Sequence, residues 1–305
     1  MMNSHDVELQ HSDSGQLRGI LRNKHEGQTS RSFFQEYDTT VVSTTTKTSR
    51  CGRIFDHIIR PCLAELFSVI FCIFIYNHVD TQLSVRHLLF FNRILVLSAV
   101  DALLFIVFLA AFQTVHLSPS ITIAQLFSLS TPWYLCILFF IQQFIGAIIG
   151  ISLFYLANSD VKLDVPKVIQ EVNSEWTKEV FELIIIQFIG TIMVVITHLM
   201  ITRRYGKNKI YTGRVSKSPL SVFGAVLLSA FLSLLHSNIS WNPLYAFALS
   251  LHNTMFESSS LVSIWQNHYI FWLGPTLGAL FGCFLFRLVF APEDKRMLAC
   301  NNTSE

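Results

Sequence analysis

The chain has 305 residues, of which 51% are hydrophobic and only 14% are charged, and its formal net charge is +2. This composition excludes an ordinary soluble domain, which carries about 25% charged residues, and a nucleic-acid-binding protein, which needs a clustered basic surface. A mean hydropathy of +0.47 and 27 phenylalanines are instead typical of a protein that crosses a membrane several times.

The first 58 residues are polar, mixed in charge and rich in Ser and Thr. They lack the apolar core of a signal peptide, so we expect a flexible cytosolic tail here and a membrane domain over residues 59–290. The polar segment 291–305 is expected to be a second tail. The six cysteines show no metal-ligand or C-x-x-C spacing, and we expect them to be reduced.

Six apolar segments of roughly 20 residues predict six transmembrane helices. The fifth is the weakest, because it is short and interrupted by Ser229 and Ser233. The segments are approximately Pro61–Tyr76, Ile94–Thr114, Trp133–Leu156, Val180–Ile201, Leu220–Leu235 and Tyr269–Phe290.

The charges of the loops predict the orientation in the membrane. The loop after the fourth segment has six basic residues between positions 203 and 217 and no acid, whereas the loop after the third is mixed in charge. The positive-inside rule places the basic loop in the cytosol. An even number of spans then puts both tails, 1–58 and 291–305, on the cytosolic side.

A short helix is predicted between the fifth and sixth segments. Asn242 is a good N-cap, and Pro243 is well suited to the first helical position. The apolar run Leu244–His252 is much too short to cross a bilayer. Next to a spanning helix, such an element indicates a re-entrant half-helix whose positive end faces a water-filled path.

The two halves of the chain resemble each other weakly but in the same order. This pattern predicts an inverted repeat, about 59–157 and 178–290, with a broken element in each half. The matched parts are Glu65 with Gln187, His116–Phe127 with Ser240–Leu251, and Ile145–Gly150 with Leu277–Gly282.

Residues 60–290 resemble the aquaporin (major intrinsic protein) family. HLSPSIT (His116–Thr122) looks like the family's H-[IL]-N-P-A-[VI]-T, and WLGPTLGA (Trp272–Ala279) is close to its W-x-G-P-x-x-G-A. The resemblance implies an all-α membrane fold of six transmembrane helices plus two re-entrant half-helices. Further matches are Glu65, Gln143 with Gly146-Ala147, Gln187 with Gly190-Thr191, and Asn242-Pro243.

The departures from the family pattern resemble its unorthodox branch, the superaquaporins. The first motif reads Ser118-Pro119-Ser120 and the second Asn242-Pro243-Leu244. Tyr245 follows the second motif, where orthodox members carry the selectivity arginine, so we expect Tyr245 in the selectivity region.

The resemblance assigns the remaining site residues. The side chains of Ser118 and Asn242 are expected to donate hydrogen bonds to passing water. His116 is interpreted as pore support or, alternatively, as a packing histidine. A carboxylate in lipid is costly, so Glu65 should face the protein and accept hydrogen bonds from loop backbone. Gln187 is its expected counterpart, and the in-span Asp101 is read as a partnered structural acid.

The leading interpretation is a passive channel for water and small neutral solutes such as glycerol, assembled as a homotetramer in the lipid bilayer. No metal, cofactor or nucleic-acid partner is expected, and no catalytic motif of a membrane hydrolase is present, so we do not expect an enzyme. A secondary transporter is an alternative that also uses inverted repeats. The more serious alternative is a non-conducting structural or junctional protein of the same fold.

Overall fold

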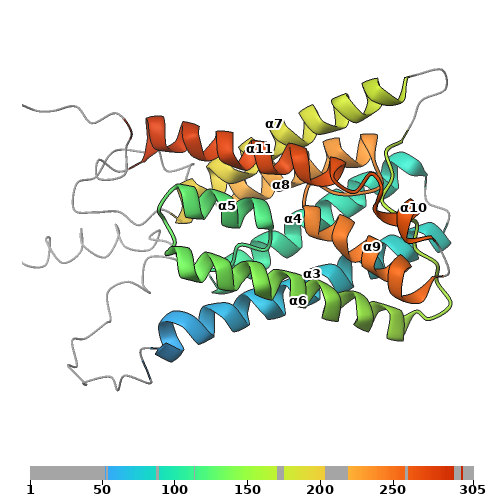
Figure 1. The fold of residues 1–305 in the computed structure, drawn as a ribbon, viewed down its shortest axis with the longest axis horizontal. Coiled ribbons are helices and arrows are strands. Elements are labelled where there is room, and N and C mark those ends of the chain that lie inside the picture. The colour runs from blue at the N-terminus through green and yellow to red at the C-terminus, as the bar shows by residue number, and fades with distance from the viewer. Residues whose placement is uncertain are drawn as a thin grey trace, which may run out of the picture. The chain divides into compact units, whose positions relative to one another are not determined.

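Apolar helices lie side by side along the molecule (Figure 1). The computed structural model describes residues 52, 54–86, 89–112, 114–169, 175–202, 219–257, 260–291 and 297, all in one compact unit. Within these ranges, six helical segments are long and apolar enough to cross a membrane. They are α3 (Arg60–Val85, preceded by the π-helical turn η2, Phe55–Ile59), α4 (Phe90–Phe112), α6 (Trp133–Ala157), α7 (Trp176–Thr202), α8 (Pro219–His236) and α11 (Ile270–Leu285, continued by the π-helical turn η4, Phe286–Phe290).

The first helix is longer than predicted at both ends. The expected span stopped at Tyr76, before a run of polar residues, but α3 continues to Val85. The amide of Asn77 donates to the Ile73 carbonyl, and Asp80 pairs with Arg93 of α4 at 2.6 Å, so these polar groups are satisfied within the helices. At the other end, helical structure begins at η2 rather than at the expected boundary of residue 59.

Two shorter helices begin inside the bundle and run toward opposite ends of it (Figure 1). The first is α5 (Pro119–Phe127) and the second is α9 (Pro243–Phe256), which is four residues longer than the predicted apolar run at its C-terminal end. A further short helix, α10 (Leu261–Trp265), precedes α11 and was not predicted. We call the end where α3 begins and α11 finishes the near end, and the opposite end the far end.

The same close packing recurs in the two halves. In the first, a Cβ added to Gly150 of α6 would lie 2.8 Å from the Ile70 carbonyl of α3. In the second, a Cβ added to Gly278 of α11 would meet the Phe188 carbonyl and the Thr191 side chain of α7. Small residues let membrane helices approach backbone to backbone. The first and last spans of each half are therefore joined in the same way, as an inverted repeat requires.

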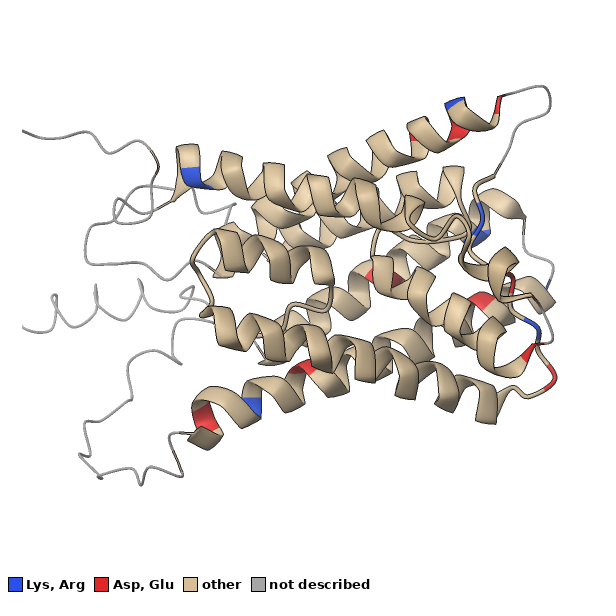
Figure 2. Cartoon of the chain, in the orientation of Figure 1, with Lys and Arg blue, Asp and Glu red and all other residues tan. Residues whose placement is uncertain are grey.

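Charge gathers at the two ends of the bundle, and the long middle band is almost free of it (Figure 2). The outer faces instead carry large apolar side chains such as Phe67 and Phe71 of α3, which are about half exposed. In water such a surface would be costly, whereas in a bilayer it contacts lipid.

Several expectations fall partly or wholly outside the described residues. These are most of both tails and the basic loop at 203–217, on which the predicted orientation depends. Cys51 and Cys300 also lie outside them. Among the described cysteines, Cys62, Cys72, Cys136 and Cys283 are all free thiols, as predicted.

Candidate functional site

The loop that leads into α5 is held by Glu65. Its two carboxylate oxygens accept the backbone N–H groups of His116 at 2.7 Å and Leu117 at 2.8 Å. Gln143 of α6 donates to the same carboxylate at 2.6 Å, and Glu65 is fully buried. A buried carboxylate is tolerated only where donors surround it. The expectation that Glu65 faces the protein and binds loop backbone is confirmed.

The contacts of His116 agree with both sequence interpretations, pore support and a packing histidine. Its ring nitrogen Nδ1 lies 3.1 Å from the hydroxyl of Thr122, and its ring packs edge-on against Phe139 with centroids 4.7 Å apart. It is also one of the residues that line a cavity at the near end. His116 thus packs in the bundle and borders open space at once.

Leu117 joins the two half-helices. Its backbone adopts φ of 62°, a left-handed conformation that is costly for a residue with a branched side chain. The N–H is held by Glu65, and the carbonyl accepts the side-chain amide of Asn242 at 2.8 Å. These bonds hold the strained turn in place, so the start of α5 and the start of α9 are fixed against each other.

The two predicted N-caps behave differently. Asn242 accepts the N–H of Leu244 through its side-chain oxygen at 3.1 Å, which makes it a true cap of α9. Ser118 has the extended backbone of a cap, but its hydroxyl makes no capping bond and has no hydrogen-bond partner among the described residues. Both side chains keep a donor for a passing molecule, because an amide NH₂ carries two hydrogens and Asn242 uses one on Leu117.

The other motif residues lie where the motifs predict. Pro119 and Pro243 occupy the first turns of α5 and α9. Ser120 and Leu244, in the same turns, are each only 1% exposed. The hydroxyl of Ser120 has no partner in the described part of the chain, so the N-cap and first turn of α5 together carry two unpaired hydroxyls, those of Ser118 and Ser120.

Gln187 does not act on its loop as Glu65 does. Its amide donates to the hydroxyl of Ser233 in α8 at 3.0 Å, and that hydroxyl donates to the Ile239 carbonyl at 2.8 Å. A neutral amide carries no charge with which to gather two backbone N–H groups. In the second half, the hydrogen bond to the loop is therefore made by Ser233. Gln187 occupies the position expected for the counterpart of Glu65, but it contacts the loop only through Ser233.

A cavity opens at each end of the bundle. The near-end cavity, about 400 Å³, is lined among others by His57, Val115, His116, Gln125 and His198. The far-end cavity, about 640 Å³, is lined among others by Asp80, Thr81, Leu97, Asn238 and Leu249. Between them lie the starts of the two half-helices.

A polar cluster lies just below the far-end cavity. Asp101 accepts the hydroxyls of Ser240 and of Tyr245, the latter at 2.9 Å, and the ring of Tyr245 stacks on Tyr76 with centroids 4.2 Å apart. We call these four residues the Asp101 cluster. Tyr76, Asp101 and Tyr245 each precede or follow a cavity-lining residue by four positions, so each lies one helical turn from the wall of that cavity.

An aromatic layer lies deeper in the bundle. The fully buried indole of Trp241 packs on Phe105 with ring centroids 6.0 Å apart, and Phe105 packs on His198 at the same separation. His198 in turn lines the near-end cavity. Trp241 immediately precedes Asn242, so this layer lies at the level where the two half-helices meet.

Sequence reasoning placed Tyr245 in this region but missed its partners. Asp101 was read as a structural acid, and Ser240, Trp241, Tyr76 and Phe105 were not singled out. One signal was available, because Asp101 is an acid in an otherwise apolar span and such residues mark functional positions. What its partners are could not be read from spacing, since Ser240 lies 139 residues away.

A family model described as "Major intrinsic protein" matches residues 55–286, about three quarters of the chain. The chain belongs to the major intrinsic protein family. With six helices able to span in its described part, this member is an integral, multi-pass membrane protein. Its assignment to the superaquaporin branch stays a prediction.

Curated relatives of this family member are aquaporins. It is 27% identical to aquaporin-1 of Bos taurus over 182 residues, 59% of this chain and 60% of that protein. It is 30% identical to aquaporin-6 of Milnesium tardigradum over 174 residues, 56% of each. The matched region thus spans less than two thirds of these relatives.

Among solved structures, the fold resembles the X-ray structure of the aquaglyceroporin from Plasmodium falciparum. The TM-score is 0.55 at 15% identity, covering 77% of this chain and 97% of that one. This likeness confirms the all-α architecture.

Proposed function

We propose that the protein is a passive channel for water and small neutral solutes. The observation that carries this proposal is the arrangement of two cavities at opposite ends of the bundle, with the N-termini of α5 and α9 between them. Half-helix N-termini present positive partial charge, which repels cations while leaving N–H groups for neutral molecules. Membership of the major intrinsic protein family supports the same function and gives no support to an enzyme.

The selectivity is proposed to reside in the Asp101 cluster. The sequence predicted Tyr245 in place of the selectivity arginine, and beside its hydroxyl lie the buried Asp101 carboxylate and the Ser240 hydroxyl. Oxygen atoms there can replace some of the hydrogen bonds that a polyol or a water molecule loses on entry. We therefore expect slow water permeation, some passage of glycerol and no ion current.

A second candidate function is favoured by specific contacts. The rings of Tyr76 and Tyr245 stack on each other, and these rings and Trp241, beside Asn242, are each at most 3% exposed. A protein whose path is closed at these two levels would be the non-conducting structural member of the family considered from the sequence.

Stopped-flow swelling of proteoliposomes separates the two candidates. Purified full-length protein should raise water flux above that of empty vesicles, with a smaller rise for glycerol. Trp241→Ala is the diagnostic variant, because it removes the bulky, fully buried indole at the half-helix junction. If neither the wild type nor Trp241→Ala raises the flux, the channel proposal is wrong. If only the variant raises it, the path of the wild type is closed.

The homotetramer remains a proposal from family resemblance. Chemical cross-linking of the protein in native membranes tests it, and a ladder that stops at four chains is expected. A ladder that ends at one or two chains would contradict the tetramer.

A further inference from the structure

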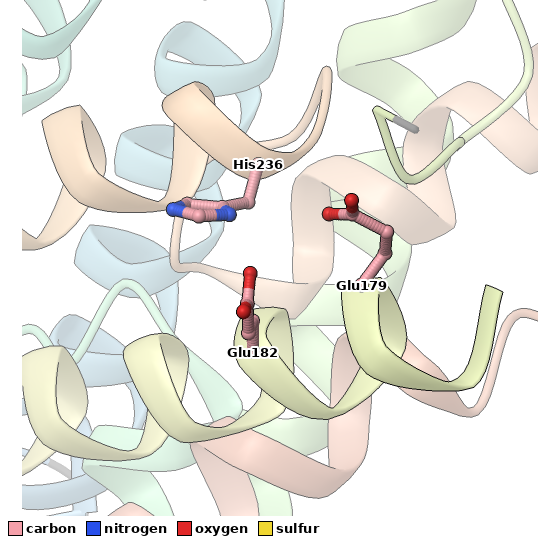
Figure 3. Close-up of side chains that lie close together, drawn as sticks. All are labelled: Glu179, Glu182 and His236. Carbon is pink, nitrogen blue, oxygen red and sulfur yellow. The ribbon is translucent and has the colours of Figure 1, made fainter. Parts of the chain in front are cut away.

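Three side chains that can bind a metal ion meet at the far end, outside the proposed path. Glu179 and Glu182 belong to the start of α7, and His236 is the last residue of α8. Their ligand atoms all lie within 4.8 Å of one another. In Figure 3 the three side chains point toward one another across the gap between the two helices.

The local structure fixes these side chains. Glu179 and Glu182 are three residues apart on one helix and therefore lie on the same face. The carbonyl of His236 accepts the N–H of Ile169 at 2.8 Å, and α7 packs against α8. The imidazole therefore comes from a different helix, held in register with the two carboxylates.

The cluster combines one buried carboxylate with two partly buried side chains, a setting that favours a bound cation. Glu179 is only 3% exposed, and it faces a second carboxylate, that of Glu182. Two carboxylates at short range repel each other, and burial strengthens the repulsion. Lys178 pairs with Glu182 at 3.6 Å, but that pair is largely exposed and weak. A divalent ion at the centre would balance both carboxylates at once.

We propose that Glu179, Glu182 and His236 form a binding site for a transition metal ion, with Zn²⁺ as the best fit. One imidazole and two carboxylates suit zinc, which takes nitrogen and oxygen ligands and leaves the fourth position of a tetrahedron to water. Ca²⁺ and Mg²⁺ prefer oxygen ligands alone, so they fit less well.

An ion bound at this site would affect the loop that follows His236. His236 is followed directly by Ser237 and Asn238, which line the far-end cavity, and then by Ser240 of the Asp101 cluster. Zn²⁺ held between α7 and α8 would fix the start of this loop. We expect it to raise thermal stability and, resting on the proposed channel function, to slow permeation.

The binding test uses the purified full-length chain, stripped with EDTA and titrated with Zn²⁺ alone by calorimetry. Because His5, His11 and His25 offer other imidazoles, the result is read as the difference between variants. Glu182→Gln and His236→Ala each remove a direct ligand and should weaken one Zn²⁺ site by more than the roughly 10- to 100-fold typical of losing an outer-shell partner, or abolish it. Glu175→Gln is the matched control, an exposed carboxylate just before α7, and should leave binding unchanged.

Co²⁺ substitution checks the geometry independently of affinity. A tetrahedral Co²⁺ spectrum in the wild type that is absent in His236→Ala supports the site. Equal Zn²⁺ affinity in all variants, or a thermal melting temperature that Zn²⁺ does not raise, overturns it. None of these measurements depends on transport, so they test the metal site even if the protein is not a channel. Thermal melts without metal show whether each variant is folded.

Discussion

At the residue scale, the re-entrant loop of the first half depends on one carboxylate. Glu65 accepts two backbone N–H groups and the Gln143 amide in a fully buried position. One of those N–H groups belongs to Leu117, whose left-handed backbone needs such support. The strain at Leu117 is stored in the loop and compensated by Glu65.

Glu65→Gln should therefore destabilise the protein rather than change its selectivity directly. The amide keeps the shape of the side chain but loses the charge that strengthens two hydrogen bonds, and we expect a loss of about 1.5 to 3 kcal/mol in unfolding free energy. Denaturant unfolding of the purified protein measures it. Asp160→Asn, an exposed acid, is the control, and an equal effect of both variants would contradict this role.

In the proposed channel, the Tyr245 ring restricts the path one helical turn from the far-end cavity. Tyr245→Ala removes both the ring that stacks on Tyr76 and the hydroxyl on Asp101, so glycerol flux should rise severalfold. Tyr245→Phe keeps the ring and should change glycerol flux little. Tyr245→Arg places a guanidinium within reach of Asp101 and should lower glycerol flux relative to water. Swelling assays in glycerol and in sucrose measure the ratios.

One outcome would contradict the proposed role of the Tyr245 ring. If the Ala and Phe variants pass glycerol at the same rate as the wild type, the ring does not limit permeation. The restriction would then lie at Trp241 and Phe105, and the selectivity proposed for the Asp101 cluster would be wrong.

The site could be predicted where a residue's own chemistry limits its surroundings. A buried carboxylate such as Glu65 requires hydrogen-bond donors, and an asparagine followed by a proline, as at Asn242, is typical of a helix N-cap. Both local contacts could therefore be predicted. The partners of Asp101 were not, because Ser240 and Tyr245 come from the other half of the chain, 139 and 144 residues away. The metal-binding cluster was missed for the same reason, since His236 lies on a different helix from Glu179 and no spacing rule links them.

At the element scale, the bundle depends on helices that approach closely through glycines. The repeated segments Ile145–Gly150 and Leu277–Gly282 contain these glycines, although the sequence did not predict the packing itself, and helix ends were predicted less well. The first span was cut short at Tyr76 because Asn77 and Asp80 are polar, although their bonds to Ile73 and Arg93 allow the helix to continue. Hydropathy counts polar side chains but does not see such partners.

Gly278→Val should force α7 and α11 apart. Its Cβ would lie 2.9 Å from the Cβ of Thr191 and closer still to the Phe188 carbonyl, and backbone cannot yield as a flexible side chain can. We expect a loss of about 1 to 3 kcal/mol or more, as for other overpacked sites. Yield of monodisperse protein and denaturant unfolding provide the measurement.

The control for this packing lies in α8. A Cβ added to Gly224 would meet nothing within 4 Å. Gly224→Ala should therefore stabilise the protein by about 0.5 to 1 kcal/mol, the helix propensity difference between the two residues. If Gly278→Val is as well tolerated as Gly224→Ala, close packing of α7 on α11 is not required.

At the scale of the whole molecule, the bundle has a defined direction in the membrane. The start of α3 and the end of η4 lie at the same end (Figure 1). Because the spans alternate in direction, α7 also ends and α8 begins there, on either side of the basic segment 203–217. The positive-inside rule then predicts that the near end faces the cytosol.

Protease access to an N-terminal tag tests this direction. On sealed, right-side-out vesicles the tag should be protected, and it should become accessible after the membrane is permeabilised. A tag in the loop 158–175, at the other end, serves as the control and should be cleaved without permeabilisation. Cleavage of the N-terminal tag from outside would show that the orientation is the opposite one, with the metal site facing the cytosol.

The bond between Asn242 and Leu117 also sets an order of events during synthesis. The two residues are 125 positions apart, so the ribosome makes the Leu117 carbonyl long before its amide partner exists. At 5 to 20 residues per second the interval is roughly 6 to 25 seconds. During that time the nascent first half sits in the membrane with a strained turn and an unpaired carbonyl, which water or the insertion machinery must accommodate. Completion of the first half therefore waits for the second, and chains truncated before residue 242 should be recognised as unfinished and degraded.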